Sequence, residues 1–212
     1  MNKNEKFVIT INRELGSGGR TVGRKLAEKL GVEFYDKAVI KGLQEKYHLT
    51  VEEIEKLKGR KQGWWADFKR QLSGGEGTSA NYYIPRVGYE PELLDTDAVF
   101  KAETEILNGI AAEESCVVAG RSGFFVFRNH PNHLSILIQA SMPSRVARVM
   151  RKQNLTEEEA RKVIEKVDQM RENYVKKYTK TSRYDTRNYD LVISADGKTE
   201  DAIVDQILMF IG

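Results

Sequence analysis

The fold is decided by residues 7–36, FVITINRELGSGGRTVGRKLAEKLGVEFYD. The β-branched run Phe7–Ile11 predicts a buried strand. A glycine-rich turn at residues 16–19 follows, and then a segment with apolar residues at helical spacing that ends at Gly31. A second strand is predicted at residues 32–35. Strand, glycine loop, helix and strand in this order are typical of a parallel βαβ unit.

The rest of the chain continues this alternation. Capping-box spacing at Thr50–Glu53 and Thr156–Glu159 marks the starts of two helices. Further strands are predicted at residues 116–119, 134–138 and 189–194, and further helices at 95–114, 143–152, 156–178 and 199–211. We therefore expect an α/β fold, with a three-layer α/β/α domain built on a five-stranded parallel sheet.

The chain is expected to form one domain over residues 1–212. Residues 59–94 lose periodicity and collect glycines and prolines, which predicts a flexible insertion. Four aromatic residues fall in this insertion, where they either form a small core or stack on a base. They are Trp64, Trp65, Tyr82 and Tyr83.

Composition excludes several classes of function. The 40% hydrophobic and 31% charged residues are typical of a soluble globular protein, and no apolar run reaches the ~20 residues of a membrane span. A net charge of +3 does not call for nucleic acid. Cys116 and the three scattered histidines lack the spacing of metal ligands, so any metal would arrive with a ligand. The single cysteine, and an N-terminus without a hydrophobic signal core, favour a cytoplasmic protein.

The glycine-rich loop is the first candidate site. It joins a buried strand to the start of a helix, where backbone N–H groups and the helix N-terminus converge on an anion. The common phosphate-loop pattern G-x-x-x-x-G-K-[ST] contains a lysine, and this loop has none. The alternative is a turn that only connects the two elements.

Several segments resemble a known family. Residues 8–36 are similar, without a gap, to the start of a cytidylate kinase, and Gly120-Arg121, Val126-Phe127 and Pro131 are similar to a later segment. Residues 189–193 and the last helix match the closing strand and helix. The run Arg13–Arg20 looks like the marker of the divergent cytidylate kinase-like family. The resemblance covers nearly the whole chain, is weakest at residues 45–95, and implies a P-loop NTPase-like fold.

The resemblance implies that the loop binds the donor phosphates of ATP and that the Thr21 hydroxyl holds Mg²⁺. The expected loop residues are Gly16, Ser17, Gly18, Gly19, Arg20 and Thr21. Gly19 stands where the phosphate-binding lysine of cytidylate kinases lies. Arg20 and Arg13 are the two candidates to supply the missing charge, because a guanidinium binds phosphate oxygens in a bidentate manner.

The resemblance also implies an acceptor site. Arg121 follows an inner strand at the sheet edge where open parallel sheets bind ligands, and it is expected to contact the acceptor's phosphate. Ser122 stands where the kinases carry an aspartate, which leaves an acceptor other than CMP open. Asp36 corresponds to an aspartate beside the acceptor, and it is equally suited to cap the following helix. With Arg13, these residues form the expected substrate-binding set.

The charged segment at residues 154–188 is expected to form a helical lid. Arg171 would close over the transferring phosphoryl group and act with Arg20 and Arg121 in catalysis. The alternative is a solvated helix face. Asp168, three residues before Arg171, is expected to pair with it on an exposed face and to fix its direction.

The leading hypothesis is a kinase that transfers the γ-phosphoryl group of ATP, with Mg²⁺, to CMP or dCMP. Its partners would be small-molecule nucleotides, without nucleic acid or membrane, and a homo-oligomer is left open. One alternative is a kinase for another small acceptor, suggested by Ser122. The other is a nucleotide-binding protein without turnover, suggested by the missing lysine.

Overall fold

The computed structural model describes residues 1–37, 39–40, 43–44, 49–60, 65 and 97–212. Most of the expected insertion at residues 59–94, including Trp64, Tyr82 and Tyr83, lies outside these residues. Trp65 is described, and its side chain is buried in a core cluster, 2% exposed. The same cluster contains Val8 and Ile106, so Trp65 packs in the core beside the sheet and not in a separate small core of the insertion.

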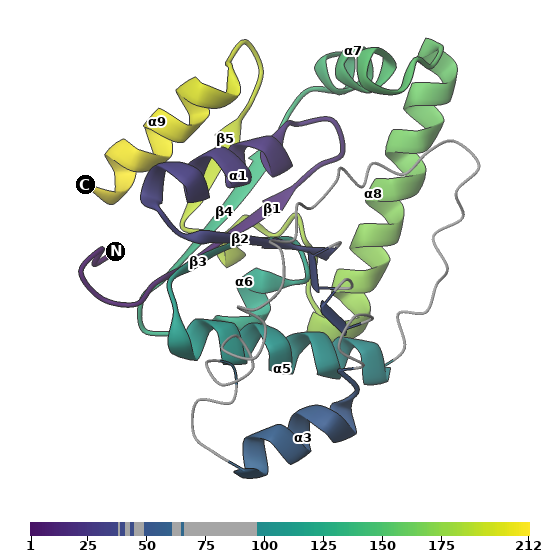
Figure 1. Ribbon diagram of the computed structural model, residues 1–212. Helices are drawn as coiled ribbons and strands as arrows, with labels where there is room; N and C mark the ends of the chain where they lie inside the picture. Colours follow the sequence, from purple (N-terminus) through teal and green to yellow (C-terminus); the bar gives the residue numbers. More distant parts are fainter. Residues whose placement is uncertain (38, 41–42, 45–48, 61–64, 66–96) are drawn as a thin grey trace.

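The centre of the molecule is a sheet of five parallel strands, in the order β2-β3-β1-β4-β5 (Figure 1). The strands are β1 (Val8–Arg13), β2 (Glu33–Asp36), β3 (Cys116–Ala119), β4 (His133–Gln139) and β5 (Leu191–Ser194). Ile11 of β1 pairs with Ala119 of β3 and with Ile136 of β4. The carboxyl ends of the three inner strands therefore meet at one edge, and the predicted α/β fold class is confirmed.

Helices occupy both faces of the sheet and its carboxyl edge. They are α1 (Gly19–Leu30), α3 (Val51–Arg60), α5 (Asp97–Glu113), α6 (Gly123–Val126), α7 (Met142–Gln153), α8 (Glu157–Thr179), η1 (Thr186–Asn188) and α9 (Glu200–Ile211). Of these, α6 and η1 were not predicted, because four and three residues are too few to show a helical period. Among the described helices, none is both long and apolar enough to cross a membrane.

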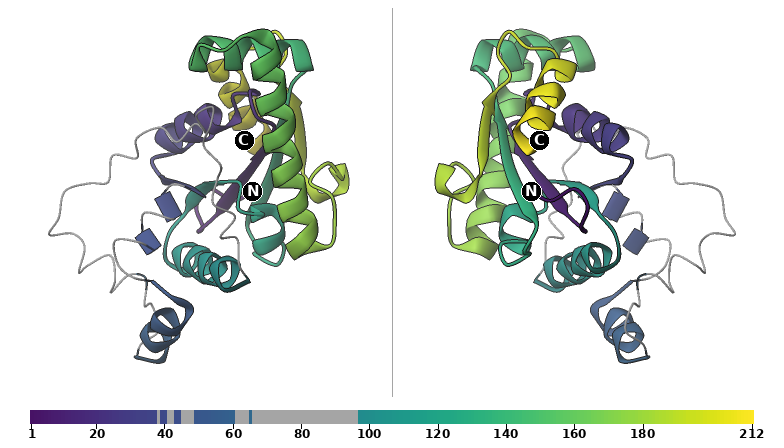
Figure 2. Two further views of the ribbon diagram at one scale, coloured as in Figure 1. Left: turned by 90° about the vertical axis from the view of Figure 1, so that its right-hand side faces the viewer. Right: turned by 90° about the vertical axis from the view of Figure 1, so that its left-hand side faces the viewer.

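The period of two along β1 divides the core between the two faces. Val8 packs with α5, whereas Ile9 and Ile11 pack with α1 and α9. Figure 2 shows α3 beyond α5, on the side away from the sheet. A third, smaller cluster joins α7 to α8, and both helices lie beside the carboxyl edge of the sheet (Figure 1). The carboxyl ends of the inner strands therefore face the α7–α8 pair.

The expected helix starts are partly confirmed. The Thr156 hydroxyl accepts from the Glu159 N–H, and the Glu159 carboxylate accepts from the Thr156 N–H, which completes a capping box at α8. The Thr50 hydroxyl accepts from the Glu53 N–H at 3.2 Å at the start of α3. Asp36 also acts as a cap, because its carboxylate accepts from the Val39 N–H at 3.2 Å.

The packing of α5 on the sheet predicts a cost for truncating Ile106, which is fully buried. Ile106→Ala should lower the free energy of unfolding by about 2–5 kcal/mol, because it removes buried methyl groups and leaves a cavity. Urea denaturation measures the change. Met209→Ala on α9 is the control, since Met209 is 76% exposed, and it should change stability by less than about 0.5 kcal/mol. Equal losses in the two variants would contradict this description of the core.

Candidate functional site

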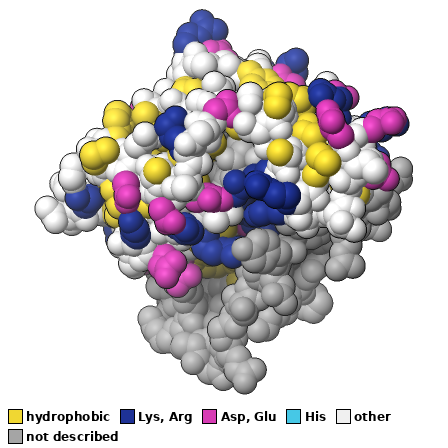
Figure 3. Space-filling view, turned by 90° about the horizontal axis from the view of Figure 1, so that it is seen from above, with side chains coloured by type: hydrophobic (Ala, Val, Ile, Leu, Met, Phe, Trp, Pro, Cys, Tyr) yellow, Lys and Arg dark blue, Asp and Glu magenta, His cyan; other side chains and the backbone are white. Residues whose placement is uncertain are grey.

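A cavity of about 630 Å³ lies at the carboxyl ends of β1 and β3. Its walls come from the glycine loop, the first turn of α1, the turn after β3, and helices α7 and α8. Figure 3 shows Lys and Arg side chains gathered near the middle of the face seen from above. Among the described residues, the basic ones that line the cavity are Arg13, Arg20, Lys37, Arg121, Arg148, Lys152, Arg171 and Lys177, and the acidic ones are Glu14 and Asp36. This excess of cations suits a ligand with several negative charges.

The glycine loop turns sharply into α1. Gly16 and Gly18 have φ of 87° and 85°, in the left-handed region that favours glycine. A Cβ on Gly16 would lie 2.8 Å from the carbonyl oxygen of Arg145, so this position requires glycine for space as well. Gly18 is the N-cap of α1, and the next three residues, 19–21, line the cavity. The N-terminus of α1 is thus open to an anion.

Ser17 differs from the other residues of the expected loop set, because it does not line the cavity. Its buried hydroxyl donates to the Glu14 carbonyl at 3.0 Å, and its N–H donates to the same carbonyl at 3.3 Å. These bonds close the turn at the start of the loop. The Ser17 side chain therefore stabilises the turn and does not face the cavity.

The loop is held to α8 by the carboxylate of Asp168, a residue that is only 8% exposed. Its Oδ1 atom accepts from the Leu15 N–H at 3.1 Å and lies 3.3 Å from the Arg183 Nη1 atom. Its Oδ2 atom accepts from the Arg145 guanidinium, and Arg171 lies 3.7 Å from Oδ1. The expected pairing of Asp168 with Arg171 is present, but the expectation of an exposed face was wrong. Asp168 joins three arginines and the loop.

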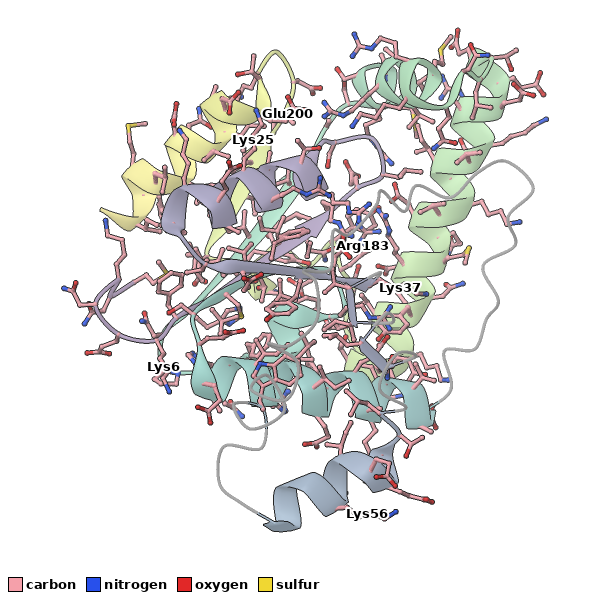
Figure 4. All side chains as sticks on the ribbon, in the orientation of Figure 1. Lys6, Lys25, Lys37, Lys56, Arg183 and Glu200 are labelled. Atoms are coloured by element: carbon pink, nitrogen blue, oxygen red, sulfur yellow. The ribbon has the colours of Figure 1, made fainter. Side chains whose placement is uncertain are left out.

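Arginines outnumber carboxylates around Asp168. Figure 4 shows Arg183 in the middle of the molecule, between the sheet and α8, and this residue is fully buried. Arg171 and Arg183 both donate to the carbonyl oxygen of Arg13. Removal from water, with the nearby Arg183, lowers the pKa of Arg171 to about 10. Removal from water and the nearby Arg171 also lower the pKa of Arg13 well below its ordinary value.

Arg20 and Asp36 form a pair across the mouth of the loop. The Arg20 Nε atom lies 2.6 Å from Asp36 Oδ2, and Asp36 is 2% exposed. The other carboxylate oxygen caps the segment after β2. The expected role of Asp36 as a cap is therefore present, and the residue also lines the cavity.

The turn after β3 carries the expected acceptor residues. Arg121 is buried and forms an ion pair with Glu103 of α5, and it donates to the Tyr174 hydroxyl of α8 at 2.9 Å. Its guanidinium also lies 4.7 Å from the centre of the Tyr174 ring. Arg121 and Ser122 both have φ of 52°, a conformation that is costly for residues other than glycine. Three separate elements thus converge on Arg121.

The residues for a metal ion are few in the described part of the chain. No group of three or more His, Cys, Asp or Glu residues there is arranged to hold an ion unaided. Thr21 lines the cavity in the first turn of α1, so its hydroxyl suits a Mg²⁺ ion that arrives with phosphate ligands.

A family description, "cytidylate kinase-like family", matches residues 8–196 of this chain. The chain belongs to this family. A curated shikimate kinase from Aeromonas salmonicida (strain A449) is 24% identical over 217 residues, which is 98% of each chain. An uncharacterized protein from Eubacterium ventriosum ATCC 27560 has a similar fold, with a TM-score of 0.70, 22% identity and coverage of 97% of this chain and 98% of that one. Shikimate kinase from Bacteroides thetaiotaomicron follows with a TM-score of 0.52, 13% identity and the same coverage.

In this cytidylate kinase-like chain, the structure adds residues that the sequence did not single out. Arg145 lies on the buried face of α7, between apolar positions, and its Nε atom donates to the Leu15 carbonyl at 2.8 Å. Arg183 falls within the charged segment at residues 154–188, and nothing in the sequence distinguishes it there. Tyr174 is spaced like an ordinary helix residue. The available signal was a charged residue at an apolar position of a helix, and Arg145 carries it, as does Glu103 three residues before Ile106.

The Asp168 cluster predicts a large effect from a small change. Asp168→Asn keeps an oxygen for the Leu15 N–H but removes the negative charge among three arginines. The free energy of unfolding should fall by about 3–5 kcal/mol, as for other broken buried ion pairs. Asp205→Asn removes an exposed partner of Lys29 and should cost no more than about 1 kcal/mol. Denaturation curves that give the same small loss for both variants would rule out the central role of Asp168.

Proposed function

We propose that this chain is a kinase that transfers the γ-phosphoryl group of ATP to a small anionic acceptor, with CMP or dCMP as the leading candidates. The observation that carries the proposal is the cation-rich cavity at the N-terminus of α1. Membership of a cytidylate kinase-like family supports the same activity.

On the donor side, the loop and the N-terminus of α1 would bind the phosphates of ATP. The Thr21 hydroxyl would hold Mg²⁺, which neutralises charge on the phosphate oxygens when bound. Arg171 would face the transferring group from α8, with its direction fixed by Asp168 and by the carbonyl oxygen of Arg13. These contacts would position the phosphates and stabilise the negative charge of the transition state.

On the acceptor side, Arg121 would bind an anionic group of the substrate. Its contacts with Glu103 and Tyr174 hold the guanidinium at the cavity wall. The Ser122 hydroxyl is buried, 4% exposed, and forms no hydrogen bond within the described residues. An acceptor that reaches the turn after β3 would satisfy this hydroxyl.

The pairing of the cavity carboxylates with arginines favours a phosphate acceptor over an alcohol. Transfer breaks the bond between the γ-phosphorus and ADP and forms a bond to an acceptor oxygen. An alcohol must also give up its proton to a base, whereas a phosphate at neutral pH already presents a negative oxygen. The two described carboxylates of the cavity are engaged by arginines, Glu14 by Arg145 and Asp36 by Arg20. This supports a nucleoside monophosphate.

A small alcohol is the second candidate. It is favoured by Ser122, which stands where the resemblance implies a nucleoside-binding aspartate, and by the shikimate kinase that is 24% identical. The two candidates differ in the acceptor alone, so one assay separates them.

The assay is coupled release of ADP from ATP and Mg²⁺ with CMP, dCMP, UMP, AMP, GMP, shikimate and gluconate in turn. We expect the highest kcat/KM with CMP or dCMP, and a rate without acceptor that is far lower. Turnover with shikimate alone would support the second candidate. ATP binding without turnover on any acceptor would contradict the proposed activity.

Arg121→Met tests the acceptor site, and it is combined with Glu103→Gln so that no buried carboxylate is left unpaired. The pair of changes should lower kcat/KM for the acceptor by about 10²–10³-fold, as for the loss of one preorganised donor to a charged group. The affinity for ATP should stay the same. Arg128→Met, an exposed arginine near the same turn, is the matched control. An unchanged kcat/KM in the double variant would remove Arg121 from the site.

A further inference from the structure

The side chain of Arg13 crosses the cavity wall where the glycine loop meets the turn after β3. We infer that Arg13 takes the place of the lysine that the phosphate loop lacks, and that its guanidinium binds the phosphates of the donor nucleotide. This inference rests on the proposed function.

Steric contacts fix the path of the side chain at both ends. A Cβ placed on Gly19 would lie 2.6 Å from the Arg13 Cβ atom and 3.1 Å from its Cγ atom. A Cβ placed on Gly120 would lie still closer to the Arg13 Nη1 atom. Non-bonded contacts of a Cβ atom shorter than 3.0 Å essentially never occur. Both glycines therefore leave the space that the arginine fills, one beside its base and one beside its guanidinium.

The same contacts account for the missing lysine. Gly19 is the loop position where the resemblance places a lysine, and a side chain there would collide with Arg13. Positions 13 and 19 thus share one space, and only one of them can carry a long basic side chain. This chain has its cation on β1.

The surroundings of the guanidinium suit an anion. Arg171, Arg183 and Arg20 are repulsive neighbours of Arg13, and Asp36 is an attractive one. Within the described part of the chain, the Arg13 guanidinium donates no hydrogen bond to another residue, although it lines the cavity. A cation with more like than unlike charges around it, removed from water, gains most from a phosphate.

The backbone of Arg13 is held independently of its side chain. Its N–H donates to the Asn12 side-chain oxygen at 2.9 Å, and its carbonyl oxygen accepts from Arg171 and Arg183. The alternative cation, Arg20, is held by Asp36 at 2.6 Å. Of the two arginines that the sequence offered, Arg13 is therefore the better placed.

The first test uses Arg13→Met, which keeps an unbranched, shorter side chain and removes the guanidinium with its charge. Binding of inorganic triphosphate, measured by calorimetry, should weaken by at least about tenfold, and kcat/KM for ATP should fall by about 10²–10³-fold. Arg151→Met, an exposed arginine of α7 outside the cavity, should leave both unchanged. Triphosphate binding that is the same in Arg13→Met and in the original protein would overturn the inference, whether or not the protein turns over any acceptor.

The second test moves the cation from β1 to the loop. Arg13→Gly with Gly19→Lys should recover at least about tenfold of the triphosphate affinity lost in Arg13→Gly alone, because loss of the Arg13 Cβ atom makes room at position 19 and the lysine restores a cation in the same space. Gly19→Ala alone should weaken binding, because its methyl group displaces Arg13. A role for Arg13 in folding alone predicts no recovery in the exchange variant. Thermal denaturation confirms that each variant is folded, and a folded exchange variant without recovery would contradict the inference.

Discussion

The carboxylate of Asp168 is the interaction on which the site depends. It holds the Leu15 N–H before the glycine loop, and it holds Arg145 of α7 and Arg183 after α8. Loop, α7 and α8 are thereby fixed relative to one another by a single buried group. A charge pair in such a place contributes little net stability over apolar packing, but its disruption is costly. The arrangement therefore serves position more than stability, and it keeps several guanidinium groups beside the N-terminus of α1.

The cavity has more positive than negative side chains among the described residues that line it. Burial lowers the pKa of both Arg13 and Arg171, and a neighbouring arginine adds to the shift, Arg171 for Arg13 and Arg183 for Arg171. Strain adds to this cost at Arg121 and Ser122, which adopt a left-handed conformation in the turn after β3. Sites that store unfavourable electrostatics and strain are often those that bind a ligand of complementary charge. A nucleotide triphosphate is such a ligand, because its charge is concentrated on adjacent phosphates.

Sequence reasoning reached the fold because the signals for strands and helices are local. The β-branched run of β1, the glycines after it and the capping box at Thr156 are each short stretches of consecutive sequence. The same reasoning reached the loop and Arg121, since both lie at predicted strand ends. It could not reach the Asp168 cluster, whose members come from positions 15, 145, 168, 171 and 183, because only tertiary packing brings them together. It also read the Asp168–Arg171 pair as exposed, since i,i+3 spacing gives the partner but says nothing of burial.

A crystal structure with a non-hydrolysable ATP analogue and Mg²⁺ tests the central claim most directly. The account predicts that the terminal phosphates lie between the backbone of residues 16–21 and the guanidinium groups of Arg13 and Arg171, at the hydrogen-bonding distance of about 3 Å. Asp168 should keep its contacts with Leu15, Arg145 and Arg183. A nucleotide bound elsewhere, with no phosphate within reach of Arg13 and Arg171, would contradict the account.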